Sequence, residues 1–394
     1  MDTTYGRAIT ANARWFAVME DSRGFIAVPA DEYYGIEGDA SLIGHAISVR
    51  TWGLKLSGDC ALLKSALRSA RWPAERQDER GGWHKLAGFS LDAAQCVFEG
   101  FCTYERMTGD KQFHKVMVRA ADRMITGTVR DDGTLAIGNL TECGEYAHFA
   151  FLAWKQTGLE RHRRGAEAIL GVIMDNFDET EGYWNTAVEP EMNTVLRGVN
   201  PCLSPILRAC VARMHLKGKT AAEIGEHMLP LVMNGRGPQY SLGMMDAESL
   251  LDTLDGTVDL PRLRAQTLCA LDWVTKHCTG PMAGSLVESR KVPPGEEVYL
   301  LPAINDCENA SLWPTSACLM AMVGINDPPR WGDPARVKAD WRASMQDSDG
   351  GFFTHQDRAG RRFGQKFGNI NFYASAALWE YQTHMIGEDP SRRS

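Results

Sequence analysis

The stretch QDERGGWHK, Gln77–Lys85, returns much later in the chain as QDSDGGFFTH, Gln346–His355. Both copies begin with Gln-Asp and continue through two glycines into an aromatic residue. Weaker versions, EDSRGFI, VRDDGTL and DETEGYW, begin at Glu20, Val129 and Asp178. A turn that recurs about every 50 residues is typical of repeat proteins, in which each unit is a pair of secondary-structure elements. The repeat therefore predicts the architecture before any single element is assigned.

The segments between these turns have the apolar spacing of helices. In residues 90–110, Leu91, Ala94, Phe98 and Phe101 fall on one stripe, Ser90 is a candidate N-cap, and TGD forms the exit turn. The segment KQFHKVMVRAADRMI follows as a returning helix, and the next unit repeats the plan with a TGL turn. Six or seven such hairpins predict an all-α toroid in a single domain, 1–394, with inner helices around a central axis and outer helices facing water.

The turns and the aromatic-rich hairpins resemble the α/α-toroid superfamily, also called (α/α)6 barrels. That superfamily includes six-hairpin glycosidases, polysaccharide lyases, sugar epimerases and terpenoid cyclases. The resemblance covers most of the chain and implies the fold and an enzyme, although a shared fold alone does not fix a function. An open helical-repeat solenoid that binds partners without catalysis is the alternative.

Composition excludes several classes of partner. The formal net charge is -8 and the chain has no basic cluster, so nucleic acid is not expected as a partner. No window approaches 18 uninterrupted apolar residues, so no membrane partner is expected either. The ten cysteines include no C-x-x-C pair and the first residues lack a signal-like pattern, which predicts reduced thiols and a cytoplasmic location. Symmetric homo-oligomers are common, and this possibility stays open.

The N-terminal ends of the inner helices should meet at one mouth of the toroid, and carboxylates there are candidate catalytic groups. We single out Glu145, Asp92 and Glu308, each expected within about the first turn of an inner helix. Cleaving a glycosidic bond needs one protonated and one ionised carboxyl group. The competing interpretation is structural, because Asp and Glu also cap helices and favour the positive end of the helix dipole.

Other polar and aromatic residues at the same ends are candidate substrate-binding groups, since they hydrogen-bond hydroxyls and stack on sugar rings. The predicted set is Tyr34, His84, Glu189, Asn193, Arg197, Asn200, Asn309, Asn371 and Tyr373, with His45 at an equivalent place. Four of its members, Glu189, Asn193, Arg197 and Asn200, lie in the polar loop AVEPEMNTVLRGVNPC, 187–202. Arg197 could hold the carboxylate of a uronate. A solvated connection is the alternative interpretation of this loop.

The same loop also resembles the E-P-x-x-N segment of linalool dehydratase/isomerase, another α/α-toroid enzyme. The resemblance implies a hydro-lyase or isomerase acting on a small terpenoid alcohol. This chain departs from that pattern at Val188, where the family has cysteine, and at Glu145, where it has histidine after glycine. A saccharide or uronate hydrolase, lyase or epimerase therefore stands first, and the terpenoid enzyme is the alternative.

No cofactor and no metal is expected. Cys143, Cys202 and Cys307 could join Glu308 or His84 around zinc, but none has the spacing of a zinc motif. Buried free thiols are the commoner fate of such cysteines. Phosphate-binding and dinucleotide-binding glycine motifs are missing, as is a G-x-S-x-G nucleophile motif. Acid–base chemistry on a small-molecule or oligosaccharide substrate is the remaining enzymatic class.

Overall fold

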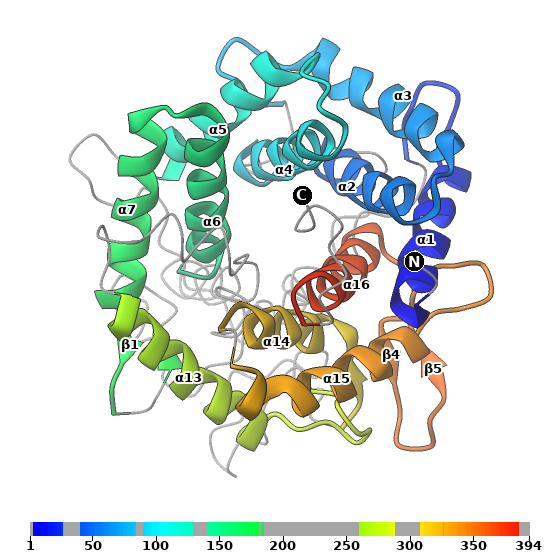
Figure 1. Ribbon diagram of the computed structural model, residues 1–394, viewed down its shortest axis with the longest axis vertical. Helices are drawn as coiled ribbons and strands as arrows, with labels where there is room; N and C mark the ends of the chain where they lie inside the picture. The colour runs from blue at the N-terminus through cyan, green and yellow to red at the C-terminus, as the bar shows by residue number, and fades with distance from the viewer. Residues whose placement is uncertain are drawn as a thin grey trace, which may run out of the picture.

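The protein forms two concentric rings of helices (Figure 1). In the computed structural model the described residues are 3–26, 40–83, 90–128, 140–175, 177–180, 183–184, 260–287, 308–325 and 327–385. The outer helices are α1 (Thr4–Val18), α3 (Cys60–Arg76), α5 (His114–Thr128), α7 (Glu160–Asp175), α13 (Leu260–His277) and α15 (Pro328–Ser344). The inner helices are α2 (Ala40–Ser57), α4 (Ser90–Thr108), α6 (Leu140–Thr157), α14 (Leu312–Ile325) and α16 (Gly368–Glu380), and α16 continues as the π-helical segment η3 (Tyr381–Met385). The predicted all-α toroid is confirmed.

Short strands join the helices outside the rings. Strands β1 (Phe177–Asp178) and β2 (Tyr183–Trp184) pair antiparallel. Strands β3 (Ala310–Ser311), β4 (His355–Gln356) and β5 (Arg362–Phe363) form a second antiparallel sheet in the order β3-β4-β5. Within the described ranges no helix is both long and apolar enough to cross a membrane. The prediction of one domain over 1–394 includes residues outside these ranges and stays a prediction.

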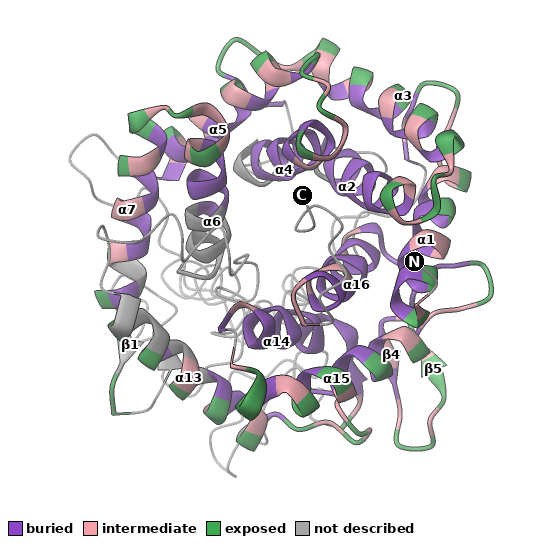
Figure 2. Ribbon diagram, in the orientation of Figure 1, coloured by how far each residue is buried: buried purple, intermediate pink, exposed green. Residues whose placement is uncertain are grey.

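The burial pattern separates the two rings. Helix α14, LWPTSACLMAMVGI, has no charged residue, and all of its residues except Gly324 are buried. A helix that is apolar on every side belongs in a core. Helix α3 instead buries one stripe, which includes Leu62, Ala66 and Ala70, and exposes its other side. Figure 2 shows the same contrast, with the inner helices largely purple and green residues distributed over the outer ones.

The inner helices α2, α4 and α6 each end on a left-handed glycine before the next outer helix. Gly58, Gly109 and Gly158 have φ values of 69°, 74° and 68° and each donates its N–H to the carbonyl four residues earlier, at 2.7 to 2.8 Å. The preceding Ser57, or the corresponding threonine, also donates its hydroxyl to the carbonyl four residues earlier. These are glycine C-caps, which end a helix and satisfy its last carbonyls.

The repeated turns connect outer helices to inner ones and pack against the following outer helix; we call all three Gln-Asp turns, although the first begins with Glu20-Asp21. Gly24, Gly81 and Gly350 have φ values of 87°, 82° and 92°. A Cβ atom on each would lie 2.2 to 2.4 Å from a carbonyl oxygen of the next outer helix, namely Arg68 in α3, Arg119 in α5 and Ala11 in α1. The first glycine of each Gly-Gly pair is therefore the equivalent of Gly24, and only glycine fits there.

The two turns that begin with glutamine use its side chain in the same way. The side-chain amide of Gln77 donates to Gly81 O at 3.0 Å and to Val116 O in α5 at 2.9 Å. The amide of Gln346 donates in the same way to Gly350 O at 2.9 Å and to Ala8 O in α1 at 2.8 Å. Each glutamine thus joins its own turn to the neighbouring outer helix.

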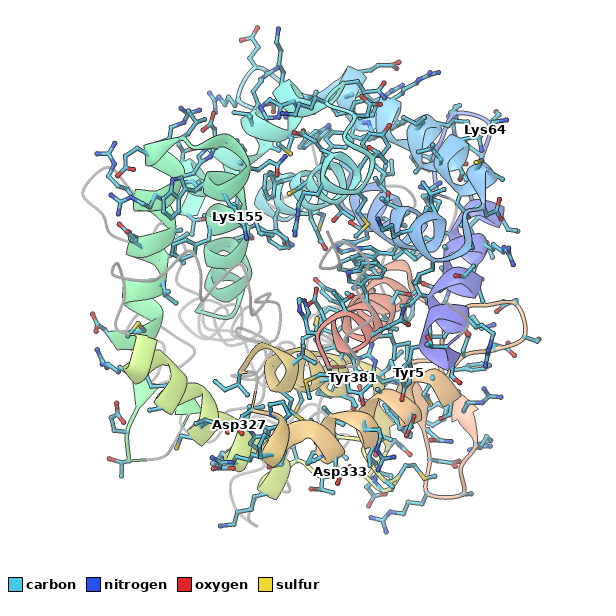
Figure 3. The ribbon with its side chains drawn as sticks, in the orientation of Figure 1. Tyr5, Lys64, Lys155, Asp327, Asp333 and Tyr381 are labelled. Carbon is cyan, nitrogen blue, oxygen red and sulfur yellow. The ribbon has the colours of Figure 1, made fainter. Side chains whose placement is uncertain are left out.

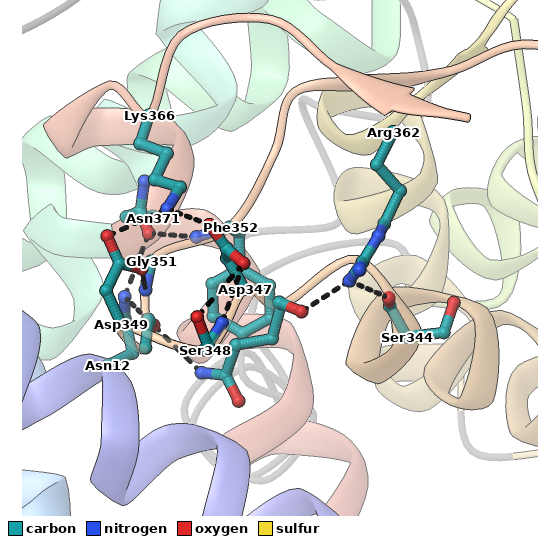
Figure 4. Close-up of polar contacts among 12 residues, drawn as sticks. Asn12, Ser344, Asp347, Ser348, Asp349, Gly351, Phe352, Arg362, Lys366 and Asn371 are labelled. Atoms are coloured by element: carbon teal, nitrogen blue, oxygen red, sulfur yellow. Dashed lines mark hydrogen bonds and ion pairs between the residues drawn. The ribbon is translucent and has the colours of Figure 1, made fainter.

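The last turn closes the ring, because α1 is the helix that follows α15 around the circle. Asn12 of α1 donates its side-chain amide to Asn371 Oδ1 at 2.9 Å and to Gly350 O at 3.1 Å (Figure 4). Ser375 of α16 donates to Asn12 Oδ1 at 2.9 Å. Where the two ends meet, Tyr5 and Tyr381 pack edge to face with ring centroids 5.3 Å apart (Figure 3).

Replacing the left-handed glycine at the closing joint should be far more costly than replacing one at a helix end. Gly350→Ala adds both positive-φ strain and overlap with the Ala11 carbonyl, so we expect a loss of about 3 kcal/mol or more in the free energy of unfolding. Gly58→Ala is the matched control, because its φ is 69° but nothing lies within 4 Å of the added Cβ. The control should lose about 1 kcal/mol. If urea denaturation gave equal losses in the free energy of unfolding for the two variants, the close contact proposed at the closing joint would be contradicted.

Candidate functional site

Outer and inner helices alternate along the chain, so the described inner helices run in one direction and their N-terminal ends lie at one end of the ring (Figure 1). Aromatic side chains from α2, α14 and α16 meet near this end. The His45 imidazole stacks on Phe372 with centroids 3.9 Å apart and planes 1° apart. Tyr373 packs edge-on against His45 at 5.5 Å and against Trp313 at 4.3 Å. We call His45, Phe372, Tyr373 and Trp313 the aromatic wall.

The aromatic wall continues along the seam between α2 and α16. Trp52 stacks on Phe372 and on Trp379, with centroids 5.8 Å apart in each pair. His45 and Trp52 are seven residues apart, as are Phe372 and Trp379, so each helix contributes two rings to one face. Stacking of this kind fixes ring orientation, and the wall is therefore a rigid, buried seam between the helices.

The contacts of α4 identify which of its faces points toward the ring axis. Toward α2 it presents Cys96 and Gly100, which lie against the backbone of Gly44. Toward α5 it presents Phe101, which stacks on Phe113 at 4.8 Å. The next two contacts define its third side, toward α6.

On that third side, Phe98 of α4 packs on Phe149 of α6 with centroids 6.2 Å apart, and Gln156 of α6 donates to Glu105 of α4 at 2.8 Å. At 100° per residue, Gln95 and Glu99 fall on none of these sides and occupy the remaining one, toward the axis. Gln95 is 0% exposed and Glu99 is 7% exposed. We call this the polar face of α4.

The three predicted catalytic carboxylates lie at different kinds of position in the structure. Asp92 is the third residue of α4 and Glu145 the sixth of α6, so both belong to inner helices, near their N-terminal ends, as predicted. Their side chains lie outside the described part of the structure. For Glu308 the expected place in the first turn of an inner helix is wrong, because it precedes β3 and lies four residues before α14 begins. Glu308 is exposed and Asn309 is half-buried. The expected approach of these carboxylates to within about 5 to 10 Å stays a prediction.

Most predicted substrate-binding residues lie outside the described residues, namely Tyr34, His84, Glu189, Asn193, Arg197 and Asn200. Tyr373 is part of the aromatic wall and is 1% exposed. Asn371 is 0% exposed and engaged in the closing joint, where its amide donates to Phe367 O at 2.7 Å. Its Oδ1 also accepts the N–H of Phe352 at 2.7 Å. A substrate contact by Asn371 stays a prediction, whereas its structural contacts are on view in Figure 4.

Truncating Asn371 should destabilise the protein because it leaves the Asn12 amide and the Phe352 N–H buried without this acceptor. We expect Asn371→Ala to lower the free energy of unfolding by about 2 to 3 kcal/mol. Asn369→Ala, two residues earlier and half-buried, is the control and should lose less than about 1 kcal/mol. Denaturant titration of the three proteins measures both, and a near-neutral Asn371→Ala would remove the residue from the joint.

Two buried groups set the electrostatics near the wall and the polar face. Arg342 of α15 is fully buried behind α16 and donates to the Tyr373 carbonyl at 2.8 Å. Burial lowers the pKa of Arg342 to about 9, so it is still a cation at neutral pH. Burial raises the pKa of Cys102 on α4 to about 11, which keeps it a thiol. Cys102 is therefore a poor nucleophile and a poor metal ligand.

Among the described residues, no group of three or more His, Cys, Asp or Glu side chains is placed to hold a metal ion. The side chains of Cys143, Cys202 and Cys307 lie outside the part of the chain that the structure describes, so their predicted state as free thiols without a metal stays a prediction.

Gln95 and Glu99 are not among the candidate site residues expected from the sequence. Two features of the sequence nevertheless point to them. Gln95 lies 50 residues after His45 and 50 before Glu145, at the same step of the repeat. Asp92, Gln95 and Glu99 are also spaced i, i+3 and i+7, which places them on one helix face.

Comparison with known proteins identifies the fold through solved structures. No protein-family model and no curated protein sequence matches the chain. An unsaturated glucuronyl hydrolase specific for heparin matches with a TM-score of 0.63 at 13% identity, over 97% of this chain and 98% of that one. The cellobiose 2-epimerase of Bacillus thermoamylovorans gives a TM-score of 0.61 at 10% identity, over 92% and 95%.

A third solved structure is an inactive variant of the α-1,6-mannanase of a Salegentibacter species in complex with α-1,6-mannotriose. It matches with a TM-score of 0.57 at 10% identity, over 95% of this chain and 98% of that one. The structural neighbours are (α/α)6 toroid enzymes that act on carbohydrates. At such low identities the likeness establishes the fold of this chain and leaves its own activity to be argued from its residues.

Proposed function

We propose that this protein is a carbohydrate-active enzyme that acts on a saccharide or uronate through carboxylate acid–base chemistry. The observation that carries the proposal is the pairing of the aromatic wall with the polar face of α4 inside a closed helical ring. Aromatic faces pack on the C–H surfaces of sugar rings, and amides and carboxylates hydrogen-bond the hydroxyls. Solved neighbours of the same fold include a hydrolase, an epimerase and a mannanase bound to mannotriose, which supports this substrate class.

The proposed chemistry uses Asp92, Glu145 and Glu308 in complementary protonation states. In hydrolysis, one carboxylic acid protonates the leaving oxygen while a second carboxylate activates water or attacks the anomeric carbon. In elimination or epimerisation, one carboxylate removes a proton next to a carbonyl or uronate carboxyl group, and a second group returns or delivers a proton. Arg197 would hold the carboxylate of a uronate.

A second candidate is a hydro-lyase or isomerase acting on a small terpenoid alcohol. The observation that favours it is the low charge of two inner helices, since α14 has no charged residue and α16 has only Glu380. An apolar substrate would pack on Trp313 and Phe372 of the aromatic wall without having to replace the hydrogen bonds of its hydroxyls. A helical-repeat protein that binds ligands without turnover is the third reading.

An activity screen on three substrate groups separates these functions. The groups are unsaturated uronate oligosaccharides, free and β-linked mannose or glucose sugars, and linalool-like alcohols. We expect turnover of the uronates or sugars, followed by product NMR and by deuterium incorporation from D2O for epimerisation. Turnover of the alcohols alone would establish the second candidate, and saturable binding without any turnover the third.

Carboxylate variants test the assignment of the chemistry. Glu145→Gln, Asp92→Asn and Glu308→Gln should each lower kcat by about 10²- to 10⁴-fold if the residue transfers a proton. Glu160→Gln is the control, since Glu160 is exposed on the outer helix α7 and pairs with Arg163. Full turnover in Glu145→Gln would remove that residue from the mechanism.

A further inference from the structure

Gln95 is a buried amide whose hydrogen-bonding capacity is unused. Its side chain is 0% exposed, and within the described structure neither Nε2 nor Oε1 has a hydrogen-bond partner. A buried amide that loses its bonds to water without replacing them destabilises a fold, so buried polar groups are nearly always paired. The unpaired amide on an inner helix therefore needs an explanation other than the stability of the fold.

The position of Gln95 points to a ligand as that explanation. The neighbours α2, α5 and α6 occupy the other sides of α4, which leaves Gln95 on the side toward the ring axis (Figure 1). Asp92, a predicted acid–base residue, occupies the position three residues earlier on the same face. At the equivalent step of the repeat, α2 carries His45 of the aromatic wall and α6 carries Glu145. Gln95 therefore belongs to the same level of the ring as the proposed chemistry.

We infer that the Gln95 amide is a substrate-binding group that hydrogen-bonds sugar hydroxyls at the polar face of α4. The inference rests on the proposed function and specifies its substrate chemistry. An amide offers donors on Nε2 and an acceptor on Oε1, and this combination matches two neighbouring hydroxyls, each of which can donate and accept. Because the amide is neutral, this contact does not require a charged group on the substrate. It selects for the arrangement of the sugar hydroxyls rather than for a carboxylate.

The chain supplies a buried glutamine whose Nε2 is paired, although its Oε1 is not, as a control. Gln266 of α13 is 2% exposed, and its Nε2 donates to Met174 O of α7 at 3.1 Å, so it joins two outer helices. Replacing it with leucine removes a contact that the fold uses. Replacing Gln95 with leucine removes an amide that the described fold does not use.

The test compares Gln95→Leu with Gln266→Leu in stability and in catalysis. We expect Gln95→Leu to keep or raise the thermal midpoint by about 1 to 2 °C, because the unpaired amide is gone. Its kcat/KM for the saccharide identified in the substrate screen should fall about tenfold or more, because the site then lacks partners for the hydroxyls. Gln266→Leu should show a lower midpoint and unchanged kcat/KM. Gln95→Asn, which keeps a shorter amide, should fall between Gln95→Leu and the wild type in kcat/KM.

Deoxy analogues of that saccharide add a readout that a structural role would not affect. The loss caused by Gln95→Leu should shrink to less than about twofold with the analogue that lacks the contacted hydroxyl, because both partners are then missing. A lower midpoint with unchanged kinetics in Gln95→Leu would overturn the assignment of Gln95 alone. If the wild type binds and converts no saccharide, the proposed function fails and the hydroxyl ligand fails with it.

Discussion

The structure depends on one repeated contact, in which a left-handed glycine of each Gln-Asp turn lies against a backbone carbonyl of the next outer helix. The approach is too close for a Cβ atom at Gly24, Gly81 and Gly350. Because the Gly350 turn meets α1, the same joint that links neighbouring hairpins also connects the last outer helix to the first. Closure is thus a property of the repeat, reinforced by the amides of Gln346 and Asn12.

Closure has a consequence for the inner helices, which are covered by neighbours on several sides and have little contact with water. Apolar residues fill such positions at no cost, as α14 demonstrates over its whole length. A polar residue there must find a partner or remain unpaired at the expense of stability. The buried Glu99 and Gln95 of α4 therefore carry more information about function than any exposed charge of the outer ring.

The sequence predicted the fold well because the fold is encoded by local signals that recur. The TGD and TGL turns became left-handed C-caps, and the helix predicted over Ser90–Asp110 is α4, Ser90–Thr108. The structure shows that Gly81 and Gly350, the first glycines of their pairs, match Gly24. A single sequence does not reveal which glycine of a pair adopts positive φ, because the close approach comes from a helix far away in the chain.

The candidate site was less predictable, because it depends on which face of each inner helix points to the axis. Asp92 and Glu145 could be placed near helix starts from capping and periodicity alone. Gln95 could not be chosen over Cys96 or Val97 until the contacts of α4 with α2, α5 and α6 were known. Asn371 shows the converse. Its place at a helix start predicted a ligand contact, whereas its Oδ1 accepts the two hydrogen bonds of the closing joint and its amide caps its own helix.

The two sides of the ring interior favour different parts of one substrate. The aromatic wall is rigid and suited to the C–H face of a ring, whereas the α4 face offers an amide and a carboxylate to its polar edge. A terpenoid alcohol would occupy the wall and leave the Gln95 amide mostly unsatisfied, because one hydroxyl cannot replace the hydrogen bonds of a full amide. A sugar has a C–H face and several hydroxyls in the same molecule. The unpaired amide therefore weighs toward a saccharide more directly than the fold does.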